Sequence, residues 1–264
     1  MNIFRRELKA TRKSLIIWGV IVVLFVIVGM SKFSAYYNNP PMLAILNSLP
    51  KAMLDAFNFQ AFKLTTVSGF FGIMFAYYAL LLCIAAAMWG SDIISKEERD
   101  KTVEFSLTLP IPRSRLVSAK ALAALANCIL LLLITWGASL VSAARYQPDS
   151  AFFKFLTLCM LALFIMQLIF LAIGILLGCA MKRYKLATST AVFLLLGTYF
   201  LSVIVTLNKN LDFLKFFSPF QYFDAARLLH ESRFNGVFII LSIAIVIVCM
   251  TGAYLTYSKR DLYI

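Results

Sequence analysis

Few residues of this chain have the types and spacing that catalysis or metal binding requires. His230, the only histidine of the 264 residues, precedes Glu231 as in the zinc-protease motif H-E-x-x-H, but Phe234 stands where the second histidine would be. None of the five cysteines belongs to a C-x-x-C pair, and all lie inside apolar blocks: Cys83, Cys128, Cys159, Cys179 and Cys249. We therefore expect no metal site and interpret the cysteines as small packing residues.

Motifs for ATP binding and for covalent catalysis are also missing from the sequence. It has no G-x-x-x-x-G-K-[ST], the loop that holds nucleotide phosphates, and no G-x-S-x-G. The apolar blocks hold almost no ionisable residues, so we expect no proton or ion relay in them. We predict that the chain is not an enzyme, has no catalytic residue and binds no cofactor itself. Any energy for its work would come from a partner.

Uncharged residues inside the apolar blocks have two alternative interpretations. Five polar side chains either form hydrogen bonds between helices or line a path for a substrate: Asn127, Thr135, Gln167, Tyr199 and Ser202. Gly174 and Gly178 form a small-xxx-small pair, which predicts close helix packing, either within one subunit or between subunits.

Long apolar elements must position these side chains. Of all residues, 62% are hydrophobic and only 14% are charged, whereas about a quarter are charged in a typical soluble domain. A bilayer core about 30 Å thick needs about 20 residues of helix. Six blocks are long enough, at residues 14–31, 69–89, 121–144, 155–180, 186–207 and 237–257. The sequence thus predicts an all-α, polytopic membrane protein in which residues 1–264 form a single transmembrane domain.

The distribution of positive charge predicts the orientation of the six spans. An even number of spans puts both termini on one side, and the segments on that side hold most of the Lys and Arg residues. By the positive-inside rule we expect both termini in the cytoplasm, at a bacterial plasma membrane, with Arg113, Arg115 and Lys120 at the headgroups before span three. The net charge of +13 is spread between the apolar blocks, which favours contact with membrane lipids over binding of nucleic acid.

Three connecting segments have structure of their own in this prediction. Before span one, Phe4 and Leu8 lie on one face of a basic stretch, which predicts an N-terminal interfacial helix, although a frayed basic tail fits equally well. Residues 32–68 include an amphipathic stretch typical of a short interfacial helix. In residues 208–236, Ser218-Pro219 interrupts any helix and aromatic residues are frequent, which indicates a re-entrant or interfacial hairpin or a plain aromatic belt.

Residues 95–115 are the long charged run of the chain. On a helical wheel, Val103 and Leu107 stack on one side, and Phe105 and Leu109 stack on nearly the opposite side. Two opposed apolar stripes suit a helix held between its own membrane domain and a second protein. A solvated loop needs neither stripe and is the alternative on this pattern alone.

This run resembles the loop between spans two and three of ABC type-2 exporter permeases, the membrane subunits of ATP-binding-cassette transporters. Many of these have an acidic stretch, Thr-x-Glu, an apolar pair and Pro-[IV]-x-Arg. The matching residues here are Glu97, Glu98, Thr102, Glu104, Phe105, Leu107, Pro110, Ile111 and Arg113. Lys101 stands where many members have glycine. The C-terminal YSKRDLYI is also similar to the family's common ending, an aromatic residue followed after two residues by Arg-Asp.

The resemblance implies that the work is shared with other subunits. Such permeases pair with a second permease copy, identical or different, and with two separate subunits that bind ATP. A cytoplasmic coupling helix within residues 91–120 would contact the ATPase through Glu97, Glu98, Thr102, Glu104, Phe105, Leu107, Pro110 and Arg113. The implied function is ATP-driven export, and the short outer segments favour an amphipathic peptide or a hydrophobic small molecule as substrate. A membrane scaffold or assembly factor that transports nothing fits the same hydropathy.

Overall fold

The computed structural model describes residues 3–37, 62–99, 112–181, 183–207 and 209–259, and these ranges are helical without any strand. In chain order the described helices are α1 (Ile3–Phe33), α4 (Val67–Arg99), α6 (Arg113–Ala144), α7 (Ser150–Ala180), α8 (Tyr184–Leu207), η2 (Lys209–Phe217), α9 (Pro219–Tyr222), α10 (Ala225–Glu231) and α11 (Gly236–Lys259). Six of them are long and apolar enough to cross a membrane, namely α1, α4, α6, α7, α8 and α11. The prediction of an all-α protein with six spans is therefore confirmed.

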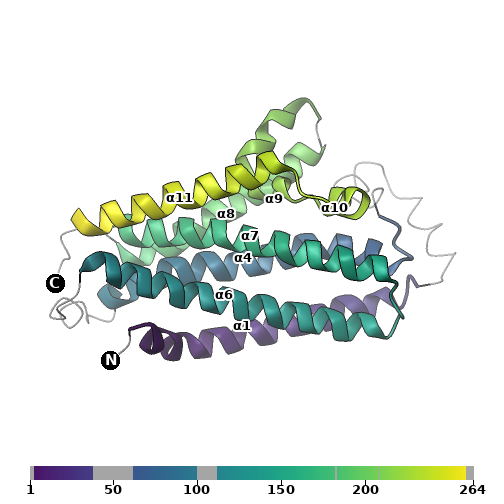
Figure 1. Ribbon diagram of the computed structural model, residues 1–264, viewed down its shortest axis with the longest axis horizontal. Coiled ribbons are helices and arrows are strands. Elements are labelled where there is room, and N and C mark those ends of the chain that lie inside the picture. Colours follow the sequence, from purple (N-terminus) through teal and green to yellow (C-terminus); the bar gives the residue numbers. More distant parts are fainter. Residues whose placement is uncertain (1–2, 38–61, 100–111, 182, 208, 260–264) are drawn as a thin grey trace.

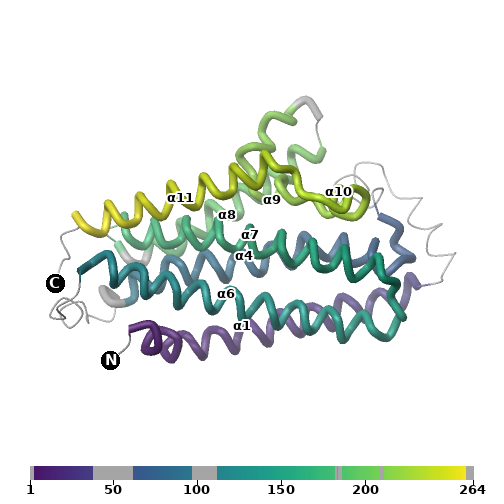
Figure 2. The backbone as a smooth tube through the Cα atoms, in the orientation of Figure 1, coloured from purple at the N-terminus to yellow at the C-terminus, as the bar shows by residue number. Residues whose placement is uncertain are grey.

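The six long helices form an up-and-down bundle whose neighbours in sequence run in opposite directions (Figure 1). Helices α4 and α7 form the most extensive contact, and both are largely buried. Around this central pair, α6 packs between α1 and α4, α8 packs on α4, and α11 packs on α7. The tube in Figure 2 shows that α1 begins, α4 ends, α6 begins and α11 ends at the same end of the bundle. We call it the terminal end, and we call the other the opposite end.

Glycines allow α4 and α7 to approach each other closely. An ideal Cβ built on Gly174 would lie 2.5 Å from the carbonyl oxygen of Ala87, and one on Gly178 would lie 2.7 Å from that of Ser91. On the α4 side, a Cβ on Gly90 would lie 2.5 Å from the carbonyl oxygen of Leu171. Backbone therefore meets backbone along this crossing, and the small-xxx-small pair of α7 faces a helix of its own chain.

The helices differ from the predicted blocks mainly at their ends. Residues 3–33 form the single helix α1, so the N-terminal interfacial helix is not a separate element in the structure. Helix α4 continues to Arg99 and α6 begins at Arg113, so much of the predicted 91–120 loop belongs to these two helices. The amphipathic stretch in residues 32–68, at residues 42–59, lies outside the described residues.

Lys120 is a correction to the sequence-based assignment. It was expected at the headgroups, but it is 1% exposed in α6. Its Nζ donates a hydrogen bond of 2.9 Å to the backbone carbonyl of Ile93 in α4. The neighbouring helix thus supplies the acceptor that water would otherwise provide, which is what allows a charged side chain to be buried there.

Short helices connect α8 to α11 at the opposite end. Helix η2 ends at Phe217 and α9 begins at Pro219, so the predicted interruption at Ser218-Pro219 is confirmed. Proline fits there because the first residue of a helix needs no backbone N–H partner. Asp224 then starts α10 by accepting a hydrogen bond from the backbone N–H of Ala226, at 2.9 Å. These connections place α9 and α10 beside α4, α7 and α8.

Candidate functional site

Three of the residues predicted to contact an ATPase lie at the terminal end of α4 and α6. Glu97 and Glu98 belong to the last turns of α4, and Arg113 is the first residue of α6. The other predicted contact residues lie outside the described part of the chain: Thr102, Glu104, Phe105, Leu107 and Pro110. The structure thus brings the two flanks of the predicted coupling segment to one end of the bundle (Figure 1).

Arg113 connects the start of α6 to the end of α11. Its guanidinium Nη1 lies 3.2 Å from the backbone carbonyl of Ser258 and 3.4 Å from that of Tyr257. The last carbonyls of a helix have no partners within the helix, and a cation near them is favourable. One turn further along α6, the hydroxyls of Ser118 and Tyr254 are 2.8 Å apart. The helix that follows the coupling segment is therefore fastened to α11.

Polar side chains also fasten α1 to its neighbours near the terminal end. Glu7 is 1% exposed and forms an ion pair with Lys96 of α4, one residue before Glu97. Asn127 Nδ2 of α6 donates to Thr11 Oγ1 over 2.8 Å. The indole Nε1 of Trp89 donates to Ser14 Oγ over 2.9 Å. These three contacts, which we call the terminal-end network, connect α1 to both helices that flank the coupling segment.

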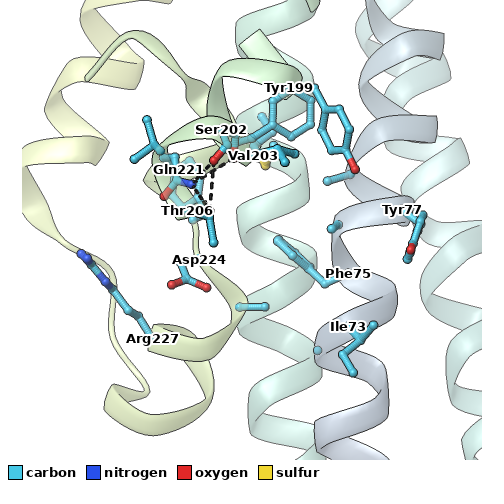
Figure 3. Close-up of a pocket in the computed structure, with 18 of the residues that line it drawn as sticks. Ile73, Phe75, Tyr77, Tyr199, Ser202, Val203, Thr206, Gln221, Asp224 and Arg227 are labelled. Atoms are coloured by element: carbon cyan, nitrogen blue, oxygen red, sulfur yellow. Dashed lines mark hydrogen bonds between the residues drawn. The ribbon is translucent and has the colours of Figure 1, made fainter. Parts of the chain in front are cut away.

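A second feature, a cavity of about 390 Å³, lies toward the opposite end. One wall is α4 with Phe75, and the other is α8 with Tyr199, Ser202 and Thr206 (Figure 3). Met166 of α7 and residues of the short helices complete the lining. The latter are Asp212 of η2, Phe220 and Gln221 of α9, Ala225 and Arg227 of α10, and Phe223 and Asp224 between α9 and α10. The cavity therefore combines an apolar wall from α4 with polar groups from the short helices.

Gln221 organises the polar side of the cavity. Its amide Nε2 lies 2.8 Å from the backbone carbonyl of Ser202, 3.1 Å from Ser202 Oγ and 2.9 Å from Thr206 Oγ1 (Figure 3). Ser218 Oγ donates a further bond of 2.7 Å to the carbonyl of Thr198. These bonds hold α9 against the end of α8 and fix the position of the polar groups.

Tyr222 ties α9 to η2. Its hydroxyl donates a hydrogen bond of 2.5 Å to the backbone carbonyl of Phe216, and its ring stacks on Phe238 of α11. Burial raises the pKa of the Tyr222 phenol to about 12, so it remains a donor at physiological pH. The short helices therefore have anchors on α8, α11 and each other.

The five polar side chains singled out within the spans differ in their surroundings, and a role in a substrate path stays a prediction. Asn127 bonds to α1, and Gln167 Nε2 lies 3.5 Å from the carbonyl of Cys128 in α6, as expected for hydrogen bonds between helices. Thr135 instead donates to the carbonyl of Leu131 in its own helix. Tyr199 and Ser202 line the cavity. Polar residues within a span were thus a usable signal for the cavity.

Sequence reasoning missed several residues of these sites. Glu7 and Lys96 looked like ordinary charges of a basic stretch and a polar run, and their pairing depends on the packing of α1 on α4. Gln221 and Asp224 occupy an aromatic-rich connection that has no recognisable motif. Their one local signal was a break in the helix followed by an aspartate that could cap the next helix.

A comparison with known protein families identifies a match along nearly the whole chain. The family described as "ABC-2 family transporter protein" matches residues 1–262. The match includes all six long helices and the segment between α4 and α6. A search of curated proteins gives no match.

Proposed function

Because this chain belongs to the ABC-2 family of transporter proteins, we propose that it is the permease subunit of an ATP-driven exporter. Proteins of the family are membrane components of transporters and associate with ATP-binding subunits. The match over residues 1–262 is the observation that carries the proposal, since it includes every long apolar helix of the chain. The absence of a phosphate-binding loop motif from the sequence fits a protein whose ATP is bound by a partner.

In this proposal, residues 97–113 form the contact with the ATPase. An acidic start and two apolar stripes suit a groove on a second protein. The flanks of this segment are the ends of α4 and α6, which are connected to α1 by the terminal-end network and to α11 by Arg113. A movement of the ATPase would therefore reach four of the six spans through direct contacts.

The remaining parts of the proposal concern assembly, orientation and substrate. Two ATP-binding subunits and a second permease copy would complete the transporter, with the translocation path in the paired membrane domains. Its place would be a bacterial plasma membrane, with both termini in the cytoplasm, in accordance with the excess of Lys and Arg on that side. The substrate would be an amphipathic peptide or a hydrophobic small molecule.

Co-purification tests the contact with an ATPase directly. The affinity-tagged full chain would be isolated from its native membranes, and any protein with a phosphate-binding loop motif would be identified by mass spectrometry. We expect such a partner with the wild-type chain, and we expect Glu104→Lys and Phe105→Asp to lose at least about 90% of it, because each places an unfavourable charge in the contact. Glu231→Lys is the matched control, since Glu231 is exposed in α10 at the other end of the bundle.

Transport is tested separately in vesicles that contain the purified complex. ATP-dependent movement of a solute across the vesicle membrane would distinguish a transporter from a scaffold. Retention of the ATPase by both Glu104→Lys and Phe105→Asp would refute the proposed contact. A complex that hydrolyses ATP but moves none of a panel of amphipathic peptides and apolar drugs would refute the proposed substrate class.

A further inference from the structure

The cavity between α4, α8 and the short helices presents an unbalanced carboxylate. Of the three charged side chains that line it, Asp212 is already paired, because its Oδ2 accepts from Lys215 over 2.5 Å. Asp224 uses Oδ1 to cap α10, and within the described chain Oδ2 has no hydrogen-bond donor. Arg227 is exposed, and its guanidinium extends away from the aromatic side chains of the cavity (Figure 3). Asp224 is therefore the carboxylate of the lining that has no ion pair within the described chain.

Gln221 and Thr206 present acceptors to the cavity, whereas the hydroxyls of Tyr77, Tyr199 and Ser202 in its lining can donate or accept. Both hydrogens of the Gln221 amide nitrogen are used on Ser202 and Thr206, which leaves its carbonyl oxygen available. The hydroxyl of Thr206 already donates to the carbonyl of Ser202, over 3.0 Å. A ligand with a positive charge or with N–H groups would find acceptors in Gln221, Thr206 and Asp224.

Aromatic rings form the other part of the lining. Phe75 is buried in α4, and Tyr199 points from α8 toward α4 across the cavity (Figure 3). Phe220 lies edge-on to Tyr199, with ring centroids 5.4 Å apart. Ring faces attract organic cations and also accept apolar groups. The volume of about 390 Å³ lies in the range of pockets for small organic molecules and is small for a folded or extended peptide.

We propose that this cavity binds a small amphipathic organic cation, with Asp224 as its counter-charge and Phe75, Tyr199 and Phe220 around its apolar part. The inference deepens the proposed function and rests on it for the biological role of the ligand. Of the two substrate classes proposed above, it selects the small molecule for this cavity. Binding itself requires neither the ATPase nor transport.

Equilibrium binding to the purified full chain, in an uncharged detergent, tests the proposal. Radiolabelled methyltriphenylphosphonium is the cationic probe, and triphenylphosphine oxide, which has an oxygen in place of the methyl group, is its uncharged competitor of similar shape. We expect the cation to bind the wild-type chain at least about fivefold more tightly than the neutral compound, the factor expected for one partly solvated charge pair. Without such a preference the proposal fails.

Asp224→Asn removes the charge and preserves the fold of the site, because asparagine also caps helices well. In this variant the preference for the cation should fall to about one, while the neutral compound binds as before, which shows that the cavity is intact. Asp149→Asn is the control, since Asp149 caps α7 outside the cavity and the preference should be unchanged. An unchanged preference in Asp224→Asn would overturn the assignment.

The aromatic part is tested by Tyr199→Leu, which should weaken both compounds, and by Tyr199→Phe, which should weaken neither. Equal binding by Tyr199→Leu and the wild type would place the ligand elsewhere. Charge-selective binding without movement of any compound of the panel in the vesicle assay would refute the proposed substrate class of the exporter and leave this binding site standing. Solute movement without charge-selective binding would support the exporter and refute this binding site.

Discussion

Gly174→Ala should separate the two central helices of the bundle. The added Cβ would lie 2.5 Å from the carbonyl oxygen of Ala87, 3.0 Å from the backbone nitrogen of Ser91 and 3.2 Å from Cα of Gly90. All three atoms belong to the backbone of α4, so no side-chain rotation can relieve the overlap. To reach ordinary contact, α4 and α7 must move apart by roughly 1 Å along their most extensive interface.

The expected loss follows from two opposed terms. Overpacking of a tight interior costs about 1–3 kcal/mol, whereas alanine in place of a helical glycine gains up to about 1 kcal/mol. We therefore expect Gly174→Ala to lower the free energy of unfolding by about 1–2 kcal/mol. In Gly137→Ala and Gly197→Ala only the gain in helix propensity applies, because an ideal Cβ at either position meets nothing within 4 Å. They should be neutral or slightly stabilising.

Reversible unfolding in mixed micelles, followed by circular dichroism against the mole fraction of dodecyl sulfate, measures these differences. The two control glycines lie in α6 and α8, so the comparison holds residue type, size and secondary structure constant. If Gly174→Ala unfolds at the same detergent fraction as Gly137→Ala, the close α4–α7 contact is not present in the protein.

Three further substitutions test other side-chain contacts of the structure. Glu7→Gln breaks a buried ion pair with Lys96 and should destabilise the chain by about 3 kcal/mol in the same unfolding assay, and a loss below about 1 kcal/mol would contradict the pairing. Trp89→Phe removes the donor to Ser14 and should cost about 1 kcal/mol, with little further loss when Ser14→Ala is added. Gln221→Leu removes the hydrogen bonds from α9 to α8, so amide hydrogen exchange in α9 and α10 should become faster while exchange in α1 is unchanged. If α9 and α10 exchange at the same rate in the variant and the wild type, these hydrogen bonds do not hold the short helices.

The number and type of spans were predictable because they depend on local composition. A block of about 20 apolar residues must become a membrane helix wherever its neighbours lie. The ends were harder to predict, because polar residues there are satisfied by other helices. Ser91 lies against the hydroxyl of Thr188 at 3.0 Å, and Lys120 donates to the carbonyl of Ile93. Neither partner is visible from the sequence near these residues.

The site residues likewise divide into those that local sequence could predict and those that depend on how the helices pack. The coupling segment stood out because its residues are contiguous and form a recognisable order. The cavity joins residues of α4 to residues of α8 and α10 that lie more than 100 positions later in the sequence, so only the packing of the helices brings them together. Ser202 and Tyr199 gave a partial signal as polar groups in an apolar span. Asp224 gave none beyond its preference for starting a helix.

The lengths of α4 and α6 have a mechanical consequence. Residues 90–99 and 113–120 continue these helices past their apolar blocks by about 15 Å and 12 Å, at 1.5 Å per residue. The bond from Lys120 to Ile93 braces the two extensions against each other, so they form a short rigid lever and not a flexible tether. A tilt of this lever by 10° moves its tip by only about 2–3 Å. A small displacement imposed on residues 100–111 would thus appear as a rotation of α4 and α6, and the stiffness of α4 between Gly90 and Arg99 would determine how much of the displacement reaches the bundle.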